Sequence, residues 1–249
     1  MDLSMIGPNI VKLLKNYWRV FLIDGVTTTL QFTCIAVFLG VILGTFVAIL
    51  KMSKFKIVRF LISIYIEVIR GTPILLQLFV FYFVLPSLLP FLDLSPFMWV
   101  AIAMCVNSGA YVSEIIRSGI QAVDKGQAEA ARSLGLSQSQ TMMKVILPQA
   151  VRNILPALGN EFIMILKETS LASTFFLGDL MTSQKIVAGA TFLHLESLFI
   201  VGAIYLCFTF PLSKLVGWFE KRMSTEKSYK NHHRKKKMNV EKGHTGVTF

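Results

Sequence analysis

The stretch GVTTTLQFTCIAVFLGVILGTFVAIL, residues 25–50, contains no charged side chain. As a helix that rises 1.5 Å per residue, it is long enough to cross about 30 Å of hydrocarbon. The composition agrees, because the 249 residues are 54% hydrophobic and only 16% charged, whereas soluble domains are roughly one-quarter charged. The stretch therefore predicts an all-α membrane protein with a single membrane domain.

Four more apolar segments follow this first span, so the sequence predicts five transmembrane helices. They cover residues 57–85, 94–113, 153–178 and 197–213. The second span is interrupted by Glu67, Arg70 and Pro73, and we expect a kink or break there because proline removes a backbone hydrogen bond. Glu67 and Arg70 are three residues apart on a helix, which favours an ion pair beside the break.

Basic residues explain the topology that we expect. They cluster in residues 51–59, 119–152 and after residue 213, and positive charge marks the cytoplasmic side. The N-terminus is then outside and the C-terminus cytoplasmic, although Lys12, Lys15 and Arg19 on the outer side run against the rule. The net charge of +11 thus indicates topology and not a nucleic-acid partner.

The chain divides into three parts on this pattern. Residues 1–20 form an amphipathic leader at the surface of the lipid bilayer, residues 21–223 form the membrane domain with a polar loop over 119–152, and residues 224–249 form a basic tail expected to be disordered. Cysteines lie in apolar runs without CxxC spacing, and His232 and His233 have no companions at ligand spacing. We therefore expect no metal, no cofactor and no catalytic residue.

The polar loop contains the segment GQAEAARSLGLSQSQTMMKVILPQA, residues 126–150. Its first half is made of good helix formers, Gly135 can adopt the left-handed conformation that ends a helix, and Ser137 can cap the next one. Two short helices joined at a glycine are predicted. From propensity alone, an ordinary amphipathic hairpin lying on the membrane remains an equal alternative.

The order of residues in this segment resembles the EAA-x3-G-x9-I-x-LP signature of ABC importer permeases. The matching residues are Glu129, Ala130, Ala131, Gly135, Leu147 and Pro148, and Val145 stands where the signature has Ile. The resemblance implies the type I ABC importer permease fold, with this loop as a coupling helix in a groove of an ATP-binding subunit. We expect Ala130 and Ala131 to allow close approach, Leu134 and Leu136 to supply apolar packing, and Glu129 to set orientation, because an exposed ion pair contributes about 1 kcal/mol or less.

Further segments resemble the polar amino acid permeases of histidine, glutamine and arginine type, over about residues 15–223. They are residues 23–33, 65–83, 107–120 and 160–173. The resemblance implies import of a polar amino acid across the bacterial cytoplasmic membrane, with three kinds of partner: an ATP-binding subunit, a second permease, identical or related, and an extracytoplasmic amino-acid-binding protein. The chain has no GxxxxGK[ST] loop, so we expect no ATPase activity of its own.

Polar and ionisable residues at membrane depth are the candidates for the substrate pathway. They are Asn107, Tyr111, Glu161, Lys167, Glu168, Thr169, Ser170 and Ser173. Such residues also join helices for structural reasons, or lie at the water boundary. Two other functions stay open: an ion-coupled secondary carrier, which predicts inverted repeats that five spans do not provide, and an ABC permease for another small solute such as cystine or an opine.

Overall fold

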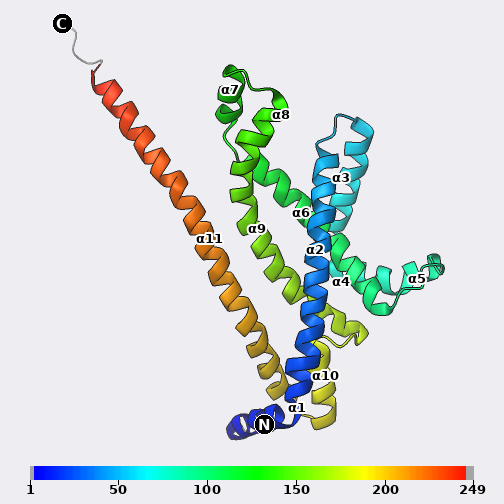
Figure 1. The fold of residues 1–249 in the computed structure, drawn as a ribbon. Helices are drawn as coiled ribbons and strands as arrows, with labels where there is room; N and C mark the ends of the chain where they lie inside the picture. Colours follow the sequence, from blue (N-terminus) through cyan, green and yellow to red (C-terminus); the bar gives the residue numbers. More distant parts are fainter. Residues whose placement is uncertain (1–2, 245–249) are drawn as a thin grey trace.

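The computed structural model describes the backbone of residues 3–244 and the side chains of residues 4–223, and all its regular elements in that range are helical. The helices are α1 (Ile6–Arg19), α2 (Val26–Lys51), α3 (Lys56–Gly71), α4 (Ile74–Phe79), α5 (Leu85–Leu88), α6 (Pro96–Gln121), α7 (Lys125–Ser133), α8 (Gln138–Thr141), α9 (Leu147–Glu168), α10 (Leu180–Thr191) and α11 (His194–His244). Short 3₁₀ or π-helical turns join several of them. Figure 1 shows α7 and α8 at one end of the bundle, and α1 and α10 at the other.

The centre of the bundle is the packing of α2 against α6. Gly40 and Gly44 on α2 face Ser108, Gly109 and Val112 on α6, and a Cβ added at Gly44 would lie 2.6 Å from the Val112 Cβ. The two backbones therefore approach more closely than any larger residue allows, which is how membrane helices gain van der Waals contact. This pairing holds the predicted first and third spans together.

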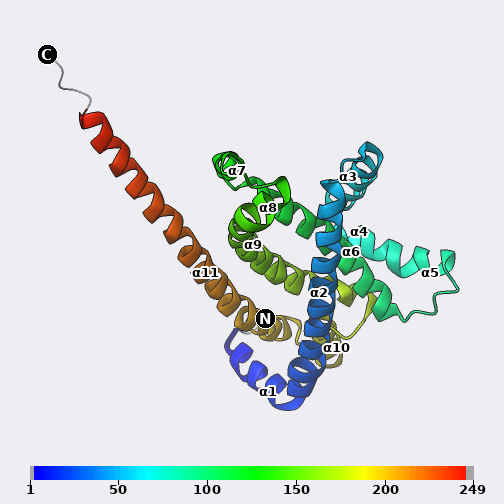
Figure 2. The same ribbon diagram turned by 45° about the horizontal axis from the view of Figure 1, so that its top comes forward.

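The predicted break in the second span is confirmed. Lys56–Gly71 and Ile74–Leu88 are bent by 106° relative to each other. Pro73 precedes α4 in an extended conformation, since its ring cannot continue the helix of α3. Figure 2 shows α4 and α5 running away from α3 across the side of the bundle.

Within the described residues, three helical segments are long and apolar enough to cross a membrane, or four if the bent pair counts as one span. They are Ile6–Lys51, Pro96–Gln121 and His194–Met223. The weaker fourth span is α9, which carries Pro148, Pro156 and several charged side chains. Five crossings therefore stay a prediction.

The fourth span differs from the expected limits of residues 153–178. Helix α9 begins earlier, at Leu147, and ends at Glu168, after which Thr169–Phe175 forms a 3₁₀ turn. The Thr169 hydroxyl donates to the Leu166 carbonyl at 2.7 Å, at the point where α9 changes into this turn. The hydroxyl-rich sequence after α9 thus forms a turn and not the end of a span.

Helix α10 was not predicted from the sequence. Asp179 caps it by accepting from Met181 N at 2.9 Å, and the Thr29 hydroxyl accepts from Leu180 N at 3.0 Å. Residues of α1, α10, α11 and the π-helical turn Val20–Gly25 share a buried cluster of Leu13, Phe21, Leu180, Val187, Ile200 and Val201. The amphipathic leader is therefore packed onto the outer layer of the bundle along one face.

The chain leaves the bundle as the long helix α11, which is helical through His244 where the sequence predicts an unpatterned tail from residue 224. Side chains after Met223, including His232 and His233, lie outside the described residues. The division into leader, membrane domain and tail stays a prediction.

Candidate functional site

Helix α7 in the polar loop ends in a Schellman motif. Leu136 N donates to the Ala131 carbonyl at 3.1 Å and Gly135 N donates to the Arg132 carbonyl at 2.9 Å. Gly135 has φ +82°, a conformation that costs a residue with a Cβ about 1–2 kcal/mol. The predicted glycine stop is confirmed.

Helix α8 starts with a capping box. Ser137 N donates to Gln140 Oε1 at 2.9 Å, and Gln140 N donates to the Ser137 hydroxyl at 3.3 Å. These reciprocal bonds satisfy two backbone donors at the start of the helix. The loop is therefore the predicted pair of short helices joined at a glycine, which we call the α7–α8 hairpin (residues 125–141).

The signature residues have unequal exposure. Leu134 is 81% exposed at the end of α7, while Glu129, Ala130 and Gly135 are also exposed and Leu136 is half-buried. Pro148 is exposed in the first turn of α9. Ala131 is only 5% exposed, because it packs against the permease itself. A missed neighbour, Met143, is exposed and apolar.

The α7–α8 hairpin is attached to the membrane helices through α6 and α9. Gln149 on α9 donates to Gln127 Oε1 on α7 at 3.4 Å, and Asn153 donates to the Gly119 carbonyl at the end of α6 at 3.2 Å. A Cβ at Gly119 would meet Ile154 Cγ1 at 2.4 Å, so α6 and α9 are in close contact there. The hairpin thus lies directly beside the junction of two long helices.

The predicted polar stripe on α6 divides into two contacts. Asn107 is buried and donates to Gln77 Oε1 at 2.9 Å. Gln77 in turn donates to the carbonyls of Ile69 and Thr72 at 2.7 and 3.2 Å, which the break after α3 leaves without helical partners. Asn107 thus holds the broken span, and Gln77 is a residue that the sequence analysis missed.

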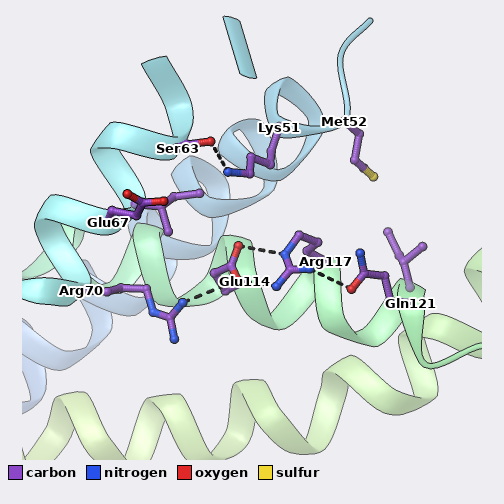
Figure 3. A pocket seen from close by; sticks show the side chains of 10 residues that line it. Lys51, Met52, Ser63, Glu67, Arg70, Glu114, Arg117 and Gln121 are labelled. Carbon is purple, nitrogen blue, oxygen red and sulfur yellow. Dashed lines mark hydrogen bonds and ion pairs between the residues drawn. The ribbon is translucent and has the colours of Figure 1, made fainter. Parts of the chain in front are cut away.

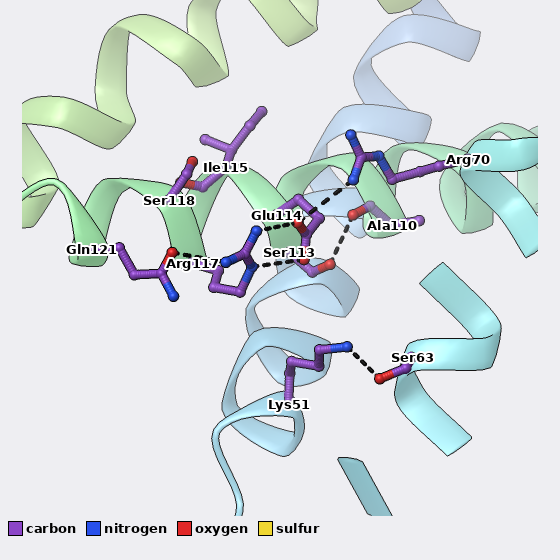
Figure 4. A network of polar contacts seen from close by, with 10 residues as sticks. All are labelled: Lys51, Ser63, Arg70, Ala110, Ser113, Glu114, Ile115, Arg117, Ser118 and Gln121. Carbon is purple, nitrogen blue, oxygen red and sulfur yellow. Dashed lines mark hydrogen bonds and ion pairs between the residues drawn. The ribbon is translucent and has the colours of Figure 1, made fainter. Parts of the chain in front are cut away.

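Tyr111 and the next turns of α6 contact α3 through charge. The Arg70 guanidinium lies 5.4 Å from the Tyr111 ring centroid and 3.5 Å from Glu114 Oε2. Arg117 donates to both Glu114 oxygens, at 2.9 and 2.6 Å, as Figure 4 shows. The predicted Glu67–Arg70 pair is therefore wrong: Arg70 pairs across helices, where Glu114 is held by two guanidinium groups. No described residue forms a hydrogen bond or ion pair with Glu67.

Glu161 is 4% exposed in the middle of α9. Its carboxyl group interacts with the Ser108 hydroxyl on α6, and Glu161 Oε1 and the Ser108 oxygen have no other hydrogen-bond partner among the described residues. Glu168, two turns further along α9, also has a buried oxygen without a described partner. Such groups are costly unless something binds them.

The remaining pathway candidates surround the end of α9. Lys167 is exposed, Ser170 is half-buried, and Thr169 and Ser173 are buried. The Ser173 carbonyl accepts from Lys185 Nζ on α10 at 2.8 Å. The Ser173 carbonyl and Lys185 therefore join the turn after α9 to α10. In the described part of the chain, His, Cys, Asp and Glu form no cluster of three that could hold a metal ion.

Comparison with known proteins places the chain among transport permeases. The family described as binding-protein-dependent transport system inner membrane component matches residues 40–225. A candidate glutamine transport system permease protein of Rickettsia felis is 40% identical over 212 residues, which cover 85% of this chain and 97% of that protein. The arginine transport system permease protein of Bacillus subtilis is 42% identical over 185 residues, covering 74% and 84%.

A solved structure gives the same answer for the fold. The crystal structure of an amino acid ABC transporter with histidines matches with a TM-score of 0.79 and 44% identity, covering 86% of this chain and 98% of that chain. The chain belongs to the family of binding-protein-dependent transport system inner membrane components, and its fold is that of a type I ABC importer permease. It is a multi-pass membrane subunit, and ATP hydrolysis belongs to a partner subunit of the transport system. An ion-coupled carrier is thereby set aside.

Proposed function

We propose that this permease imports a polar amino acid. The observation that carries this proposal is the likeness to the amino acid ABC transporter, at 44% identity over nearly the whole of that chain. The relatives named for glutamine and arginine support the same substrate class. Unpartnered oxygens of Glu161 and Glu168 offer acceptors for an ammonium group, which every amino acid carries.

The complete transporter in this proposal has two permeases, two ATP-binding subunits and an extracytoplasmic amino-acid-binding protein. The α7–α8 hairpin faces the cytoplasm and docks on the ATP-binding subunit, with exposed Leu134 as its apolar contact and Glu129 as an orienting charge. Support comes from the attachment of the hairpin to α6 and α9, which gives ATP-driven movement a route into the membrane domain. The N-terminus then lies outside.

The substrate pathway in this proposal runs along α9. Glu161, Lys167, Glu168, Thr169, Ser170 and Ser173 line it, whereas Asn107 and Tyr111 border it from α6 and hold the broken span in place. The hydroxyls and carboxyl groups of this set provide hydrogen bonds for a zwitterion at membrane depth.

Substrate-stimulated ATP hydrolysis tests the substrate class. The permease is reconstituted in lipid with its ATP-binding subunit and binding protein, and glutamine, arginine, histidine and cystine are added in turn. We expect at least one of the polar amino acids to stimulate hydrolysis and to accumulate in the vesicles. Stimulation by none of the amino acids, with another solute active instead, would refute the proposal.

A further inference from the structure

A cavity of about 500 Å³ lies between the end of α2, α3 and the last turns of α6. It is on the same end of the bundle as the α7–α8 hairpin (Figure 1). Its wall contains charges of both signs: Lys51, Glu67, Arg70, Glu114 and Arg117, which Figure 3 shows around one space. This cavity is distinct from the pathway residues on α9.

The charged side chains that line the cavity differ in how many hydrogen bonds and ion pairs they form with the protein. Glu114 is bound on both oxygens by Arg117 and approached by Arg70, so its negative charge is already matched within the protein. Lys51 donates a hydrogen bond to the neutral Ser63 hydroxyl and forms no ion pair with a described residue. Arg70 has a single ion pair at 3.5 Å, and its side chain is 43% exposed. Two cationic groups thus keep free donors.

Glu67 differs from Glu114. Its carboxylate borders the cavity and has no hydrogen bond or ion pair to any residue whose side chain is described. It lies three turns into α3, one turn beyond Ser63. Glu67 is exposed, so its carboxylate is open to a ligand that enters the cavity. Glu67 is therefore an available acceptor for a cation.

We propose that this cavity binds a small zwitterion, with the ammonium group on Glu67 and the anionic group on Arg70 and Lys51. A free acceptor and free cationic donors in one cavity match the two charges of an α-amino acid. The side chain of the ligand then occupies the rest of the space, where Met52, Ile66 and Ile120 supply apolar surface. The zwitterionic headgroup of phosphatidylethanolamine carries the same pair of charges, so it is the second possible source.

The choice of the transported amino acid as the ligand rests on the proposed function. In that case the cavity holds the substrate at the inner end of the transport pathway, before release. Charge-assisted hydrogen bonds at both ends of the ligand make the site selective for molecules that carry both charges. A molecule that has lost either charge leaves Glu67 or the Arg70 and Lys51 pair unmatched. Side-chain selectivity at this site is expected to be weak.

A thiol-protection experiment tests this site. Met52→Cys is placed at the cavity in a permease whose three native cysteines are replaced, and the assembled transporter is inserted in phosphatidylglycerol nanodiscs. The rate of alkylation by a polar maleimide is measured with L-glutamine, with N-acetyl-L-glutamine and with L-glutamine amide. We expect L-glutamine to slow alkylation, and the two analogues, each lacking one charge, to fail.

Matched variants locate the contact. Glu67→Gln keeps the shape of the side chain and removes its charge, and we expect it to raise the glutamine concentration for half protection by about tenfold or more, as loss of a charge-assisted hydrogen bond does. Asp93→Asn removes an exposed charge outside the cavity and should change nothing. Ser139→Cys, an exposed position on α8, should show no protection.

A change of the nanodisc lipid distinguishes the two possible ligands, a free amino acid and the phosphatidylethanolamine headgroup. Protection in nanodiscs that contain phosphatidylethanolamine, lost in Glu67→Gln and seen without amino acid, supports the site with the headgroup as ligand. Equal protection by L-glutamine and N-acetyl-L-glutamine, or no protection by amino acid or lipid, overturns the proposal. If uptake and stimulated ATP hydrolysis persist in that case, only the cavity proposal fails; if both are absent for every amino acid, the proposed function fails.

Discussion

Asn107 on α6 donates a 2.9 Å hydrogen bond to Gln77 on α4, and the Gln77 amide donates back to the Ile69 and Thr72 carbonyls on the other side of Pro73. The bond between these two residues therefore connects the third span to both arms of the broken second span. It makes the 106° bend a fixed feature of the fold, because the carbonyls freed by the break are satisfied in place.

Loss of the Gln77 amide is expected to destabilise the permease. Gln77→Ala removes four hydrogen bonds, including one to the Thr72 hydroxyl, whereas Asn107→Ala removes one. Interhelical hydrogen bonds in membranes are worth about 0.6 kcal/mol each on average, so we expect a loss of roughly 2 kcal/mol for Gln77→Ala and less for Asn107→Ala. Thermal unfolding of the purified transporter measures both. Gln31→Ala, an exposed amide on α2, is the control, and equal stability of all three variants would contradict this role.

The close approach of α2 and α6 predicts a second stability effect. Gly44→Ala places a Cβ 2.6 Å from the Val112 Cβ and 2.8 Å from the Gly109 carbonyl oxygen, and overpacking of this kind costs about 1–3 kcal/mol. Gly202→Ala adds a methyl group where nothing lies within 4 Å. We expect Gly44→Ala to lower the unfolding temperature and Gly202→Ala to leave it unchanged. If Gly44→Ala were neutral, the two helices would have to be further apart than described.

The fold was predictable to a large extent because uncharged length, proline and positive charge act locally. Residues 25–50, the break at Pro73 and the glycine stop at Gly135 all follow from such signals. Helix α10 was missed because its sequence is neither long nor strongly apolar, and it is held by tertiary bonds such as the one between Leu180 N and Thr29. The extent of the fourth span also differed, because the helix of α9 gives way to a 3₁₀ turn at Thr169.

The candidate site was predictable in its motif and less so in its contacts. Spacing identified the hairpin, but only the fold shows that Ala131 faces inward. Glu67 and Arg70 have the right spacing to pair along α3, yet Arg70 pairs with Glu114 on α6. Sequence spacing describes one helix at a time, and partners on another helix become visible only when the helices are packed.

Glu161 offers a test of the pathway. Its carboxyl group interacts with the neutral Ser108 hydroxyl and forms no ion pair with a described residue, so Glu161→Gln breaks no ion pair and keeps the same shape. We expect unchanged assembly and thermal stability, with uptake of the amino acid lowered by about tenfold or more, because an amide binds an ammonium group less tightly than a carboxylate does. Vesicle uptake is compared with that of Asp93→Asn. Unchanged uptake would remove Glu161 from the pathway.

A substitution at Gly135 tests whether coupling depends on the left-handed turn of the hairpin, without changing its exposed side chains. Gly135→Ala keeps the exposed face but disfavours φ +82° by about 1–2 kcal/mol. We expect weaker coupling, seen as a smaller stimulation of ATP hydrolysis by substrate, with membrane insertion unaffected. Gly217→Ala, where the added methyl group meets nothing within 4 Å, serves as the comparison. A fully coupled Gly135→Ala transporter would show that the turn need not be left-handed.

Docking of the α7–α8 hairpin on the ATP-binding subunit is the central claim, and its exposed Leu134 gives the most direct measurement. Leu134→Asp replaces an apolar contact that is 81% exposed, so the permease itself should fold normally. Phe55→Asp changes a side chain that is 73% exposed on the α2–α3 turn. Copurification of the ATP-binding subunit is measured for both. We expect at least a tenfold loss for Leu134→Asp and retention for Phe55→Asp, whereas full retention by Leu134→Asp, with substrate-stimulated hydrolysis intact, would contradict the account.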